Sequence, residues 1–320
     1  MRAVVSKRYG PPHTLRLCDV PVPKPGPGEV LVRVCAASVN SWDWDRLIGK
    51  PLARIAEPFG PSHKIAGADI AGVIEALGEG SEGFAVGDPV FGDLSDGNWG
   101  GFAEYACAPI SALAHIPDGL SFIDAATLPQ AGALALQSLR KSSVPKPSIL
   151  INGAGGGVGT FAIQMAKQLG AAITAVDSPG KRDRVLALGA NAFIDYRTID
   201  FTTAGDQYDL IIDVVAHRSA GAYARALREG GVLVVIGGTI RSLLSVACFG
   251  SVIGKTQRKR LGVLFYEVSP PDFSQLAGQC VDGRLIPIID SVFPLERAAE
   301  ALQRIGGGEA IGKIIISVSD

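Results

Sequence analysis

A short apolar strand that runs into a glycine-rich turn and then into a helix constrains this chain more than any other feature. The segment reads ILINGAGGGVGT at 149–160. Apolar residues recur at helical spacing after the turn, which predicts one buried helix face that ends at Gly170. Strand, tight turn and helix in this order bring backbone N–H groups against a phosphate. The segment therefore predicts an α/β domain with a phosphate-binding turn.

Strand-like and helix-like segments alternate after this turn. Strands are expected at 173–176, 193–195, 210–215 and 232–236, with helices between them at 181–188 and 220–227. Repeated strand–helix–strand units predict a parallel sheet with right-handed crossovers.

The first third of the chain is expected to be β-rich. Strand-like runs at 2–5, 30–36, 70–76 and 102–106 are separated by glycine and proline, which is typical of a barrel-like β unit. A helix is expected over 121–139, with Ser121 as its cap, and the tail should return to the first domain. We therefore expect a β-rich catalytic domain from 1–120 with 286–320, and a dinucleotide-binding domain at 121–285.

Charge and hydropathy exclude several function classes. The 320 residues carry a formal net charge of −1, which gives no field to attract nucleic acid or an acidic membrane. A basic cluster at Lys255, Arg258, Lys259 and Arg260 is expected to be a solvated loop. The sequence has no apolar run of about 18 residues, so we expect no membrane-spanning helix. A small molecule is therefore the expected partner.

The cysteines and the N-terminal segment indicate a cytoplasmic protein. The five cysteines are scattered and form no CxxC pair, which is typical of reduced thiols and not of a disulfide framework. The start MRAVVSKRYGPPHT has no apolar h-region, so no signal peptide is expected.

The glycine turn supplies five candidate cofactor-binding residues. A pyrophosphate needs a tight turn, close backbone approach and free N–H groups at a helix start. Ala154, Gly156 and Gly159 occupy the three positions of the usual GxGxxG frame, so an alanine replaces the first glycine. Gly157 and Val158 lie between them. The alternative is a glycine-rich helix entry without a ligand.

The end of the second strand selects the nucleotide. Asp177 lies where an acidic side chain holds a ribose 2′-hydroxyl and favours NADH. Ser178, Lys181 and Arg182 follow and offer donors to a 2′-phosphate, which charge-assisted hydrogen bonds favour. We expect NADPH, with NADH as the alternative; the two cations could instead be a solvated helical turn.

The chain resembles the medium-chain dehydrogenase/reductase superfamily, and within it the zinc-independent branch similar to quinone oxidoreductases. The resemblance covers nearly the whole chain and implies a doubly wound Rossmann sheet plus a GroES-like β-rich domain. It is carried by PVPKPGPGEVLVRVCAASVN at 21–40, GADIAGVIEALG at 67–78, FAVGDPVFG at 84–92, GGFAEYA at 100–106, LPQAG at 128–132, the glycine turn, GANAFIDY at 189–196, YDLIIDVV at 208–215 and GKIIIS at 312–317.

The positions that hold catalytic zinc in other members carry no zinc ligands here. Those members have a cysteine and a His-Glu pair where this chain has Asn40 and Ala68-Asp69. An amide and a methyl group cannot replace the thiolate and imidazole that zinc prefers. The four-cysteine lobe for structural zinc is missing, and the histidines at 13, 63, 115 and 217 show no ligand spacing. We expect no metal.

The resemblance also implies roles for residues outside the turn. Asn40 would face nicotinamide and substrate, and Tyr196 would lie against the adenosine ribose or its phosphate. Gly237 and Gly238 would end a strand beside the nicotinamide, and Lys313 would approach the cofactor from the tail. Each also has a plain structural alternative, as a turn, core, strand-end or surface residue.

Asn40 and Tyr266 are the candidate catalytic residues, and four others are candidates for the substrate pocket. Trp42 and Phe265 would form an apolar wall, and Asp43 would add a polar group. Leu134 stands where relatives carry a threonine, so a hydroxyl contact is missing there.

These features predict NADPH-dependent reduction of a quinone or an α,β-unsaturated ketone or aldehyde by hydride transfer without metal. Without zinc, easier hydride acceptors are favoured because their negative charge delocalises, and the protein orients substrate and excludes water. The alternatives are a zinc-free alcohol dehydrogenase or ketone reductase, and a non-catalytic nucleotide-binding protein of the same fold.

A homodimer is also expected. The apolar stretch at 243–249, with 261–265 beyond it, predicts an apolar sheet edge that pairing about a two-fold axis would cover. The alternatives are a helix packed inside one subunit and a wall of the substrate pocket.

Overall fold

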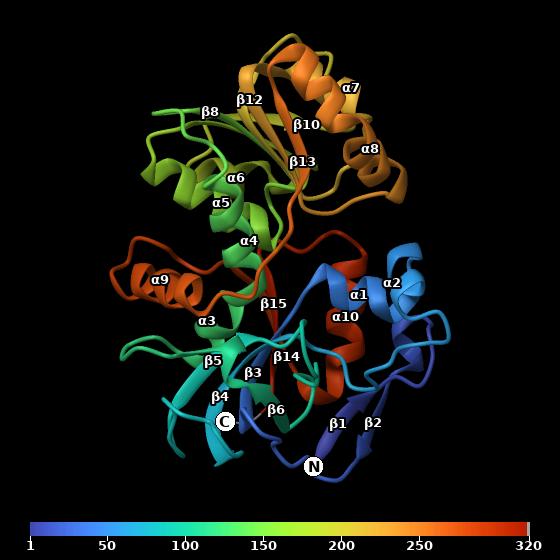
Figure 1. Cartoon of the computed structure of the whole chain (residues 1–320), viewed down its shortest axis with the longest axis vertical. Coiled ribbons are helices and arrows are strands. Elements are labelled where there is room, and N and C mark those ends of the chain that lie inside the picture. The colour runs from blue at the N-terminus through green and yellow to red at the C-terminus, as the bar shows by residue number, and fades with distance from the viewer. Residues whose placement is uncertain (319–320) are drawn as a thin grey trace. The chain divides into compact units, whose positions relative to one another are not determined.

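The computed structural model describes residues 1–318, which form two compact units (Figure 1). Unit 1 comprises Met1–Ala133 and Val268–Asp320, and unit 2 comprises Leu134–Glu267. Helices α3 (Phe122–Thr127) and α9 (Pro270–Val281) therefore belong to unit 1, whereas the sequence placed them in the nucleotide domain. The reason is packing: α3 contacts β3 (Glu29–Val39) and β4 (Asp69–Leu77), and Phe273 of α9 lies 6.1 Å from Phe91, measured between ring centroids.

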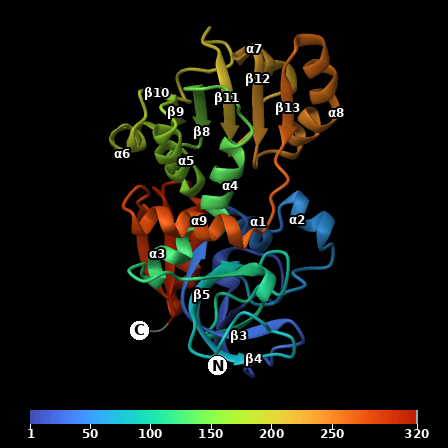
Figure 2. The same cartoon turned by 60° about the vertical axis from the view of Figure 1, so that its left-hand side comes forward.

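Unit 2 is built on a six-stranded sheet in the order β10-β9-β8-β11-β12-β13, and every pairing in it is parallel (Figure 2). The strands carry continuous apolar runs because helices cover both faces of such a sheet. This confirms the doubly wound fold. The strands are β8 (Ser148–Asn152), β9 (Ala172–Asp177), β10 (Ala192–Asp195), β11 (Tyr208–Asp213), β12 (Leu227–Val235) and β13 (Arg260–Val263).

The strand order reverses between β8 and β11, and ligands of such sheets bind outside the carboxyl ends of the strands at this point. The connecting helices of unit 2 and its flanking turn follow the expected pattern. They are α5 (Gly157–Gln168), the 3₁₀ turn η3 (Pro179–Lys181), α6 (Arg182–Leu188), α7 (Ala220–Ala226) and α8 (Ile240–Gln257), and α4 (Pro129–Leu139) begins in unit 1 and continues into unit 2.

Two expectations about helices are corrected. The single helix over 121–139 is broken into α3 and α4, because Pro129 has no N–H to donate to the carbonyl four residues earlier, even though Leu128 keeps helical backbone angles. The stretch 243–249 is not an edge strand but the middle of α8, which Thr239 caps by accepting a hydrogen bond from the Ser242 N–H at 3.3 Å. The sheet edge is β13 instead.

Unit 1 holds a seven-stranded sheet with the path β14-β15-β3-β4-β5-β7, and β6 pairs with β3. A separate pair, β1 and β2, lies beside it. Its elements are β1 (Arg2–Val5), η1 (Pro12–Thr14), β2 (Arg16–Asp19), β3 (Glu29–Val39), α1 (Ser41–Ile48), α2 (Pro51–Ala56), β4 (Asp69–Leu77), β5 (Pro89–Asp93), β6 (Tyr105–Pro109), η2 (Ile110–Ala112), β7 (Leu113–His115), α3, α9, β14 (Ile289–Pro294), η4 (Leu295–Arg297), α10 (Ala298–Gly306) and β15 (Lys313–Ser317).

The C-terminal strand completes the sheet of unit 1, as expected for the tail. β15 pairs antiparallel with β3, so that Ile314 lies opposite Val39. The strand expected at 102–106 lies later, as β6, because Phe102 instead takes part in loop hydrogen bonds with Val4 and Ala66. Within residues 1–318, we find no helix that is both long and apolar enough to span a membrane.

Candidate functional site

The glycine turn of unit 2 presents backbone and no side chain at the start of α5. Gly156 is the N-cap residue, and no side chain caps the helix there. Helix geometry leaves the N–H groups of Gly157, Val158 and Gly159 without partners inside the helix. The chain enters the turn through Gly153, whose φ of +85° lies in the left-handed region that favours glycine. The result is a set of donors at the positive end of a helix.

Glycine is required at Gly156 and Gly159 of this turn for two different physical reasons. A Cβ on Gly159 would lie 2.4 Å from the carbonyl oxygens of Gly153 and Ala154, so no side chain fits between helix and strand. A Cβ on Gly156 would meet only the Gly153 oxygen, at 3.5 Å, so it projects away from the protein. The turn therefore fits a pyrophosphate, with Gly156 on the ligand side and Gly159 in the packing.

Asp177, at the end of β9, is buried and already has partners. Its carboxylate accepts hydrogen bonds from the Gly155 N–H at 2.8 Å and the Ser178 N–H at 2.7 Å. Lys181 lies 3.6 Å from the same carboxylate and is buried with it, with its stem packed against Gly155. Lys181 thus balances the charge of Asp177, while Arg182 is exposed.

Tyr196 and the glycine pair lie at the carboxyl ends of two strands of the same sheet, β10 and β12, which are separated by β9, β8 and β11. Tyr196 follows β10 and is half-exposed, with the Arg197 guanidinium 5.8 Å from its ring centroid. Gly237 and Gly238 follow β12, and the Ala216 N–H donates to the Gly237 oxygen at 2.9 Å. A Cβ on Gly238 would lie 2.0 Å from the Ala216 oxygen, so the close approach of the two segments requires glycine.

A buried polar network lies at the end of β8, directly before the glycine turn, and it was not predicted from the sequence. Asp213, at the end of β11, accepts hydrogen bonds from Asn152 Nδ2 at 2.9 Å, Tyr223 Oη at 2.8 Å and the Val215 N–H at 3.0 Å. Burial raises the pKa of Asp213, and these hydrogen bonds to its charged form oppose that shift. The network joins β8 to β11 where the strand order reverses. The signal in the sequence was a polar residue at the end of each of two apolar strands, Asn152 and Asp213, which could have predicted this network.

Unit 1 contains a second candidate site, made of buried side chains. Lys313 Nζ donates to Asn40 Oδ1 and lies 3.4 Å from Asp69 Oδ2. Asp69 also accepts from Ser38 Oγ at 3.0 Å and from the Gln130 N–H at 3.3 Å. All five residues are buried, and Asp69 and Ser38 are 0% exposed. From the sequence, Asp69 was expected only as a replaced zinc-site residue, and no role was expected for Ser38 or Gln130.

Burial dominates the electrostatics of this cluster. It raises the pKa of Asp69 to about 6, a shift that the charge of Lys313 opposes and that of Asp93 adds to. Burial likewise raises the pKa of Asp43 to about 7. The Asp43 carboxylate accepts hydrogen bonds from the N–H groups of Asn40, at 2.7 Å, and Gly67, at 3.1 Å. Asp43 therefore holds the entry to α1, while its neighbour Trp42 is half-buried.

One polar atom of the cluster is only weakly held. Asn40 Nδ2 is buried and makes no hydrogen bond of full geometry with a described residue, although the Asn40 amide is close enough to the Asp69 carboxylate to lower its pKa. A buried, unpaired donor costs about 1–3 kcal/mol, so such an atom calls for an explanation. An acceptor oxygen supplied by a ligand would satisfy it.

The donor set here does not fit zinc. Asn40 and Ala68 offer an amide and a methyl group, and Asp43 and Asp69 have their oxygens engaged as described above. Across residues 1–318, no group of three or more histidine, cysteine, aspartate or glutamate side chains could hold a metal ion.

The remaining candidates lie in unit 2, apart in sequence from Asn40. Leu134 is half-buried on α4, and its carbonyl accepts from Ser138 Oγ at 2.7 Å. Phe265 is 89% exposed, and Tyr266 next to it is half-buried.

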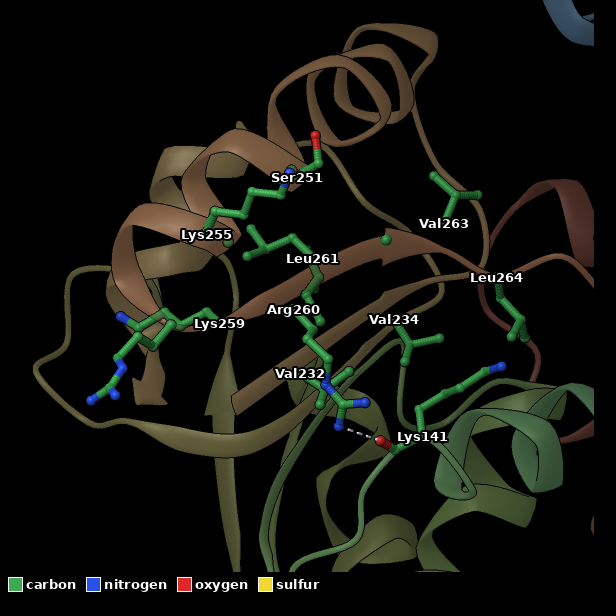
Figure 3. A pocket seen from close by; sticks show the side chains of 15 residues that line it. Lys141, Val232, Val234, Ser251, Lys255, Lys259, Arg260, Leu261, Val263 and Leu264 are labelled. Carbon is green, nitrogen blue, oxygen red and sulfur yellow. Dashed lines mark hydrogen bonds between the residues drawn. The ribbon is translucent and has the colours of Figure 1, made fainter. Parts of the chain in front are cut away.

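A groove of about 540 Å³ lies elsewhere, at the β13 edge (Figure 3). Figure 3 shows Arg260 reaching across it to the Lys141 carbonyl, a hydrogen bond of 3.0 Å. The basic cluster expected as a solvated loop lines this groove: Lys255 is in α8, Arg258 ends that helix, and Arg260 begins β13.

The fold and the two sites define an NAD(P)-binding oxidoreductase, and comparisons with known proteins agree. Residues 26–118 match the alcohol dehydrogenase GroES-like domain, and residues 188–316 match a family described as zinc-binding dehydrogenase. The chain is 32% identical to the chloroplastic quinone-oxidoreductase QR1 of Triphysaria versicolor, over 99% of this chain and 98% of that one.

Two further relatives extend the comparison. The 2-methylene-furan-3-one reductase of Solanum lycopersicum is 30% identical, over 99% of this chain and 79% of that one. The solved structure of the quinone oxidoreductase from Coxiella burnetii superimposes with a TM-score of 0.90 at 30% identity, covering 99% of both chains. The chain belongs to the medium-chain dehydrogenase/reductase superfamily, among the relatives of quinone oxidoreductases.

Proposed function

We propose that this protein uses NADPH to reduce quinones and α,β-unsaturated ketones or aldehydes without a metal. The observation that carries the proposal is the buried amide donor of Asn40, which makes no hydrogen bond of full geometry within the protein and stands where zinc-dependent members carry a cysteine. The printed names of two relatives, a quinone oxidoreductase and a furanone reductase, indicate the same substrate classes.

Asn40 does the chemical work that a metal does elsewhere in the superfamily. NADPH, when bound, supplies the hydride and with it both electrons of the reduction. The Asn40 Nδ2–H donates to the substrate oxygen on which negative charge collects, and water supplies the proton that completes the product. One such amide stabilises less charge than zinc, so acceptors that delocalise the charge react best.

The preference for NADPH rests on the pairing of Asp177 with Lys181. An unbalanced carboxylate would repel a 2′-phosphate, and the lysine at 3.6 Å offsets that charge. Ser178 and the exposed Arg182 then offer donors to the phosphate.

A substrate panel tests the proposed function. NADPH oxidation is followed with tetramethyl-1,4-benzoquinone, an enone and a simple saturated ketone. We expect turnover with the first two and slow or no turnover with the third. Preference for the simple ketone would indicate a ketone reductase, and NADPH binding without any turnover would indicate a non-catalytic nucleotide-binding protein.

We also propose a homodimer joined through β13. This strand ends the sheet of unit 2, and α8 beside it exposes Leu244, Phe249 and Val252, each by more than half. Pairing two copies about a two-fold axis covers such an edge and closes the assembly.

Light scattering at micromolar concentration tests the dimer, and a mass near 33 kDa would contradict it. Gly262→Asp adds a charge at the edge, where a Cβ meets no atom within 4 Å. This change should give a monomer with an unaltered fold, whereas Val263 packs on the core and is a poorer site for a charge. If the Gly262→Asp variant remains a dimer, the interface does not lie at β13.

We propose the cytoplasm as the location. The described chain has free cysteines at all five positions, which suits a reducing compartment. Localisation of a tagged full-length chain tests this, and the chloroplast is the alternative that the name of the Triphysaria relative raises.

A further inference from the structure

The amide of Asn40 is held firmly at its oxygen and only weakly at its nitrogen. The oxygen accepts from the Lys313 ammonium, while the buried Nδ2 makes no hydrogen bond of full geometry and has the Asp69 carboxylate nearby, whose pKa the amide lowers. Asn40 is also the N-cap residue of α1, in a capping box with Asp43, whose carboxylate accepts from the Asn40 backbone N–H at 2.7 Å. A capping box engages the amide oxygen of Asn40, so Nδ2–H keeps its capacity to donate.

Lys313 decides which end of the amide is which. An ammonium group only donates hydrogen bonds, so the atom that faces it must be the amide oxygen. A rotation of the amide by 180° would set the Nδ2 donor against the Lys313 donor. The lysine thereby fixes which end of the amide is the donor.

Asp69 in turn holds Lys313, and sheet register brings the three residues together. Ile314 of β15 lies opposite Val39 of β3, and Ser38 of β3 lies opposite Asp69 of β4. The start of β15, the end of β3 and the start of β4 therefore meet at one end of the sheet. Lys313 and Asp69 are 3% and 0% exposed, so their side chains have little freedom.

We propose that Lys313, anchored by Asp69, is a positioning residue that fixes the Asn40 amide so that its Nδ2–H donates to the carbonyl or quinone oxygen of the substrate. This inference rests on the proposed function and names the device that orients its donor. It differs from the role that family resemblance implies for Lys313, which is contact with the cofactor.

The experiment compares Lys313→Met with Asn40→Ala and with the double variant, using tetramethyl-1,4-benzoquinone. This quinone has no unsubstituted ring carbon, so the exposed Cys248 cannot add to it by replacing hydrogen. We expect each single change to lower kcat by about tenfold or more. The double variant should be no slower than Asn40→Ala alone, because Lys313 acts through Asn40.

Two further measurements separate positioning from other roles. The Kd for NADPH, from fluorescence titration, should stay within about twofold of wild type in Lys313→Met, whereas loss of a cofactor ligand would raise it about tenfold. Calorimetry should show weaker quinone binding to the NADP⁺ complex in Lys313→Met and Asn40→Ala, again without additivity. Lys313→Arg, which keeps a cationic donor, should recover most of the kcat.

The buried charge of Asp69 requires a second variant, because Lys313→Met leaves that carboxylate unpaired. Lys313→Met with Asp69→Asn removes both charges and should still show the loss of kcat. Lys7→Met, at an exposed lysine of the same unit, is the matched control and should behave as wild type.

The outcomes are distinguishable from failure of the proposed function. A wild type that turns over no acceptor contradicts that function, yet coupled losses of quinone binding would still support the positioning role. Additive effects of Lys313→Met and Asn40→Ala would overturn the inference. So would a raised NADPH Kd with unchanged kcat, or wild-type quinone binding in Lys313→Met.

Discussion

The two candidate sites of this protein differ in the groups that form them, which are backbone in unit 2 and side chains in unit 1. In unit 2, the glycine turn offers backbone N–H groups, and its shape depends on the absence of side chains at Gly156 and Gly159. In unit 1, the site consists of the side chains of Asn40, Lys313 and Asp69, all of them buried. A backbone site needs little more than local geometry, whereas a side-chain site needs partners that hold each polar group in place.

The difference extends to charge. The buried carboxylate of Asp177 in unit 2 accepts two backbone hydrogen bonds and faces Lys181. In unit 1, Asp43 and Asp69 lie within one buried cluster, and burial raises the pKa of both. Unit 2 is thus expected to respond most strongly to changes of shape, and unit 1 to changes of charge and pH.

Changes of shape in the turn should have the largest effect. Gly156→Val places a side chain on the ligand side and should weaken NADPH binding at least about tenfold, or about 1.4 kcal/mol, with little change in melting temperature. Calorimetric titration measures the affinity. Unchanged affinity would mean that the turn does not hold the pyrophosphate.

Gly159→Val is the counterpart on the packing side of the same turn. Its Cβ would overlap two backbone oxygens at 2.4 Å, so the helix must shift, and overpacking of this kind costs about 1–3 kcal/mol or more. We expect a lower melting temperature together with weaker cofactor binding. Equal melting temperatures for the two variants would show that the helix relaxes without cost.

A change of pH should act on unit 1 next. A carboxyl with a raised pKa binds its proton more tightly in the folded state, so its contribution to stability is full below about pH 4. That contribution falls as the pH rises towards the pKa of Asp43, about 7. Asp43→Asn removes this titration, so its stability relative to wild type should rise with pH, by at most about 1.4 kcal/mol per unit.

Denaturant unfolding between pH 4 and 8 measures this difference. Asp43→Asn also loses one acceptor oxygen, which lowers stability by an amount that does not depend on pH. Asp19→Asn, at an exposed position, controls for the loss of one negative charge. A stability difference that stays constant over the range would contradict the raised pKa.

Removal of the two cations after β9 should change nucleotide selectivity more than total binding. Lys181→Ala with Arg182→Ala should weaken NADPH more than NADH, because a 2′-phosphate then meets Asp177 without a balancing charge. Arg184→Ala, at an exposed arginine about 200° around the helix from Arg182, is the control for the loss of a cation. A wild type that prefers NADH, with a ratio unchanged in the double variant, would make Asp177 the selector.

Chelation should have no effect. The donor set at Asn40 and Ala68 does not fit zinc, so prolonged dialysis against a chelator should leave activity and melting temperature unaltered. Elemental analysis before and after dialysis checks the result. Stoichiometric zinc, with activity lost on its removal, would contradict the metal-free proposal.

The sequence alone determined the local elements and the family. The strand, the glycine turn and the start of α5 are contiguous, and their apolar spacing and glycines encode the structure directly. The same holds for the alternation of strands and helices that gave the parallel sheet. Prediction from the sequence failed at Pro129, which breaks a helix, and at 243–249, where an apolar stretch fits both a strand and a buried helix face.

Only the tertiary structure decided which polar residues meet. Lys313 and Asn40 are 273 positions apart, and the pairing of β15 with β3 brings them into contact. The link between Asn152 and Asp213 likewise depends on β8 and β11 being neighbours. Helix and turn signals act over a few residues, whereas strand register is set by the packing of the whole sheet. The glycine turn could therefore be read from the chain, and the environment of Asn40 could not.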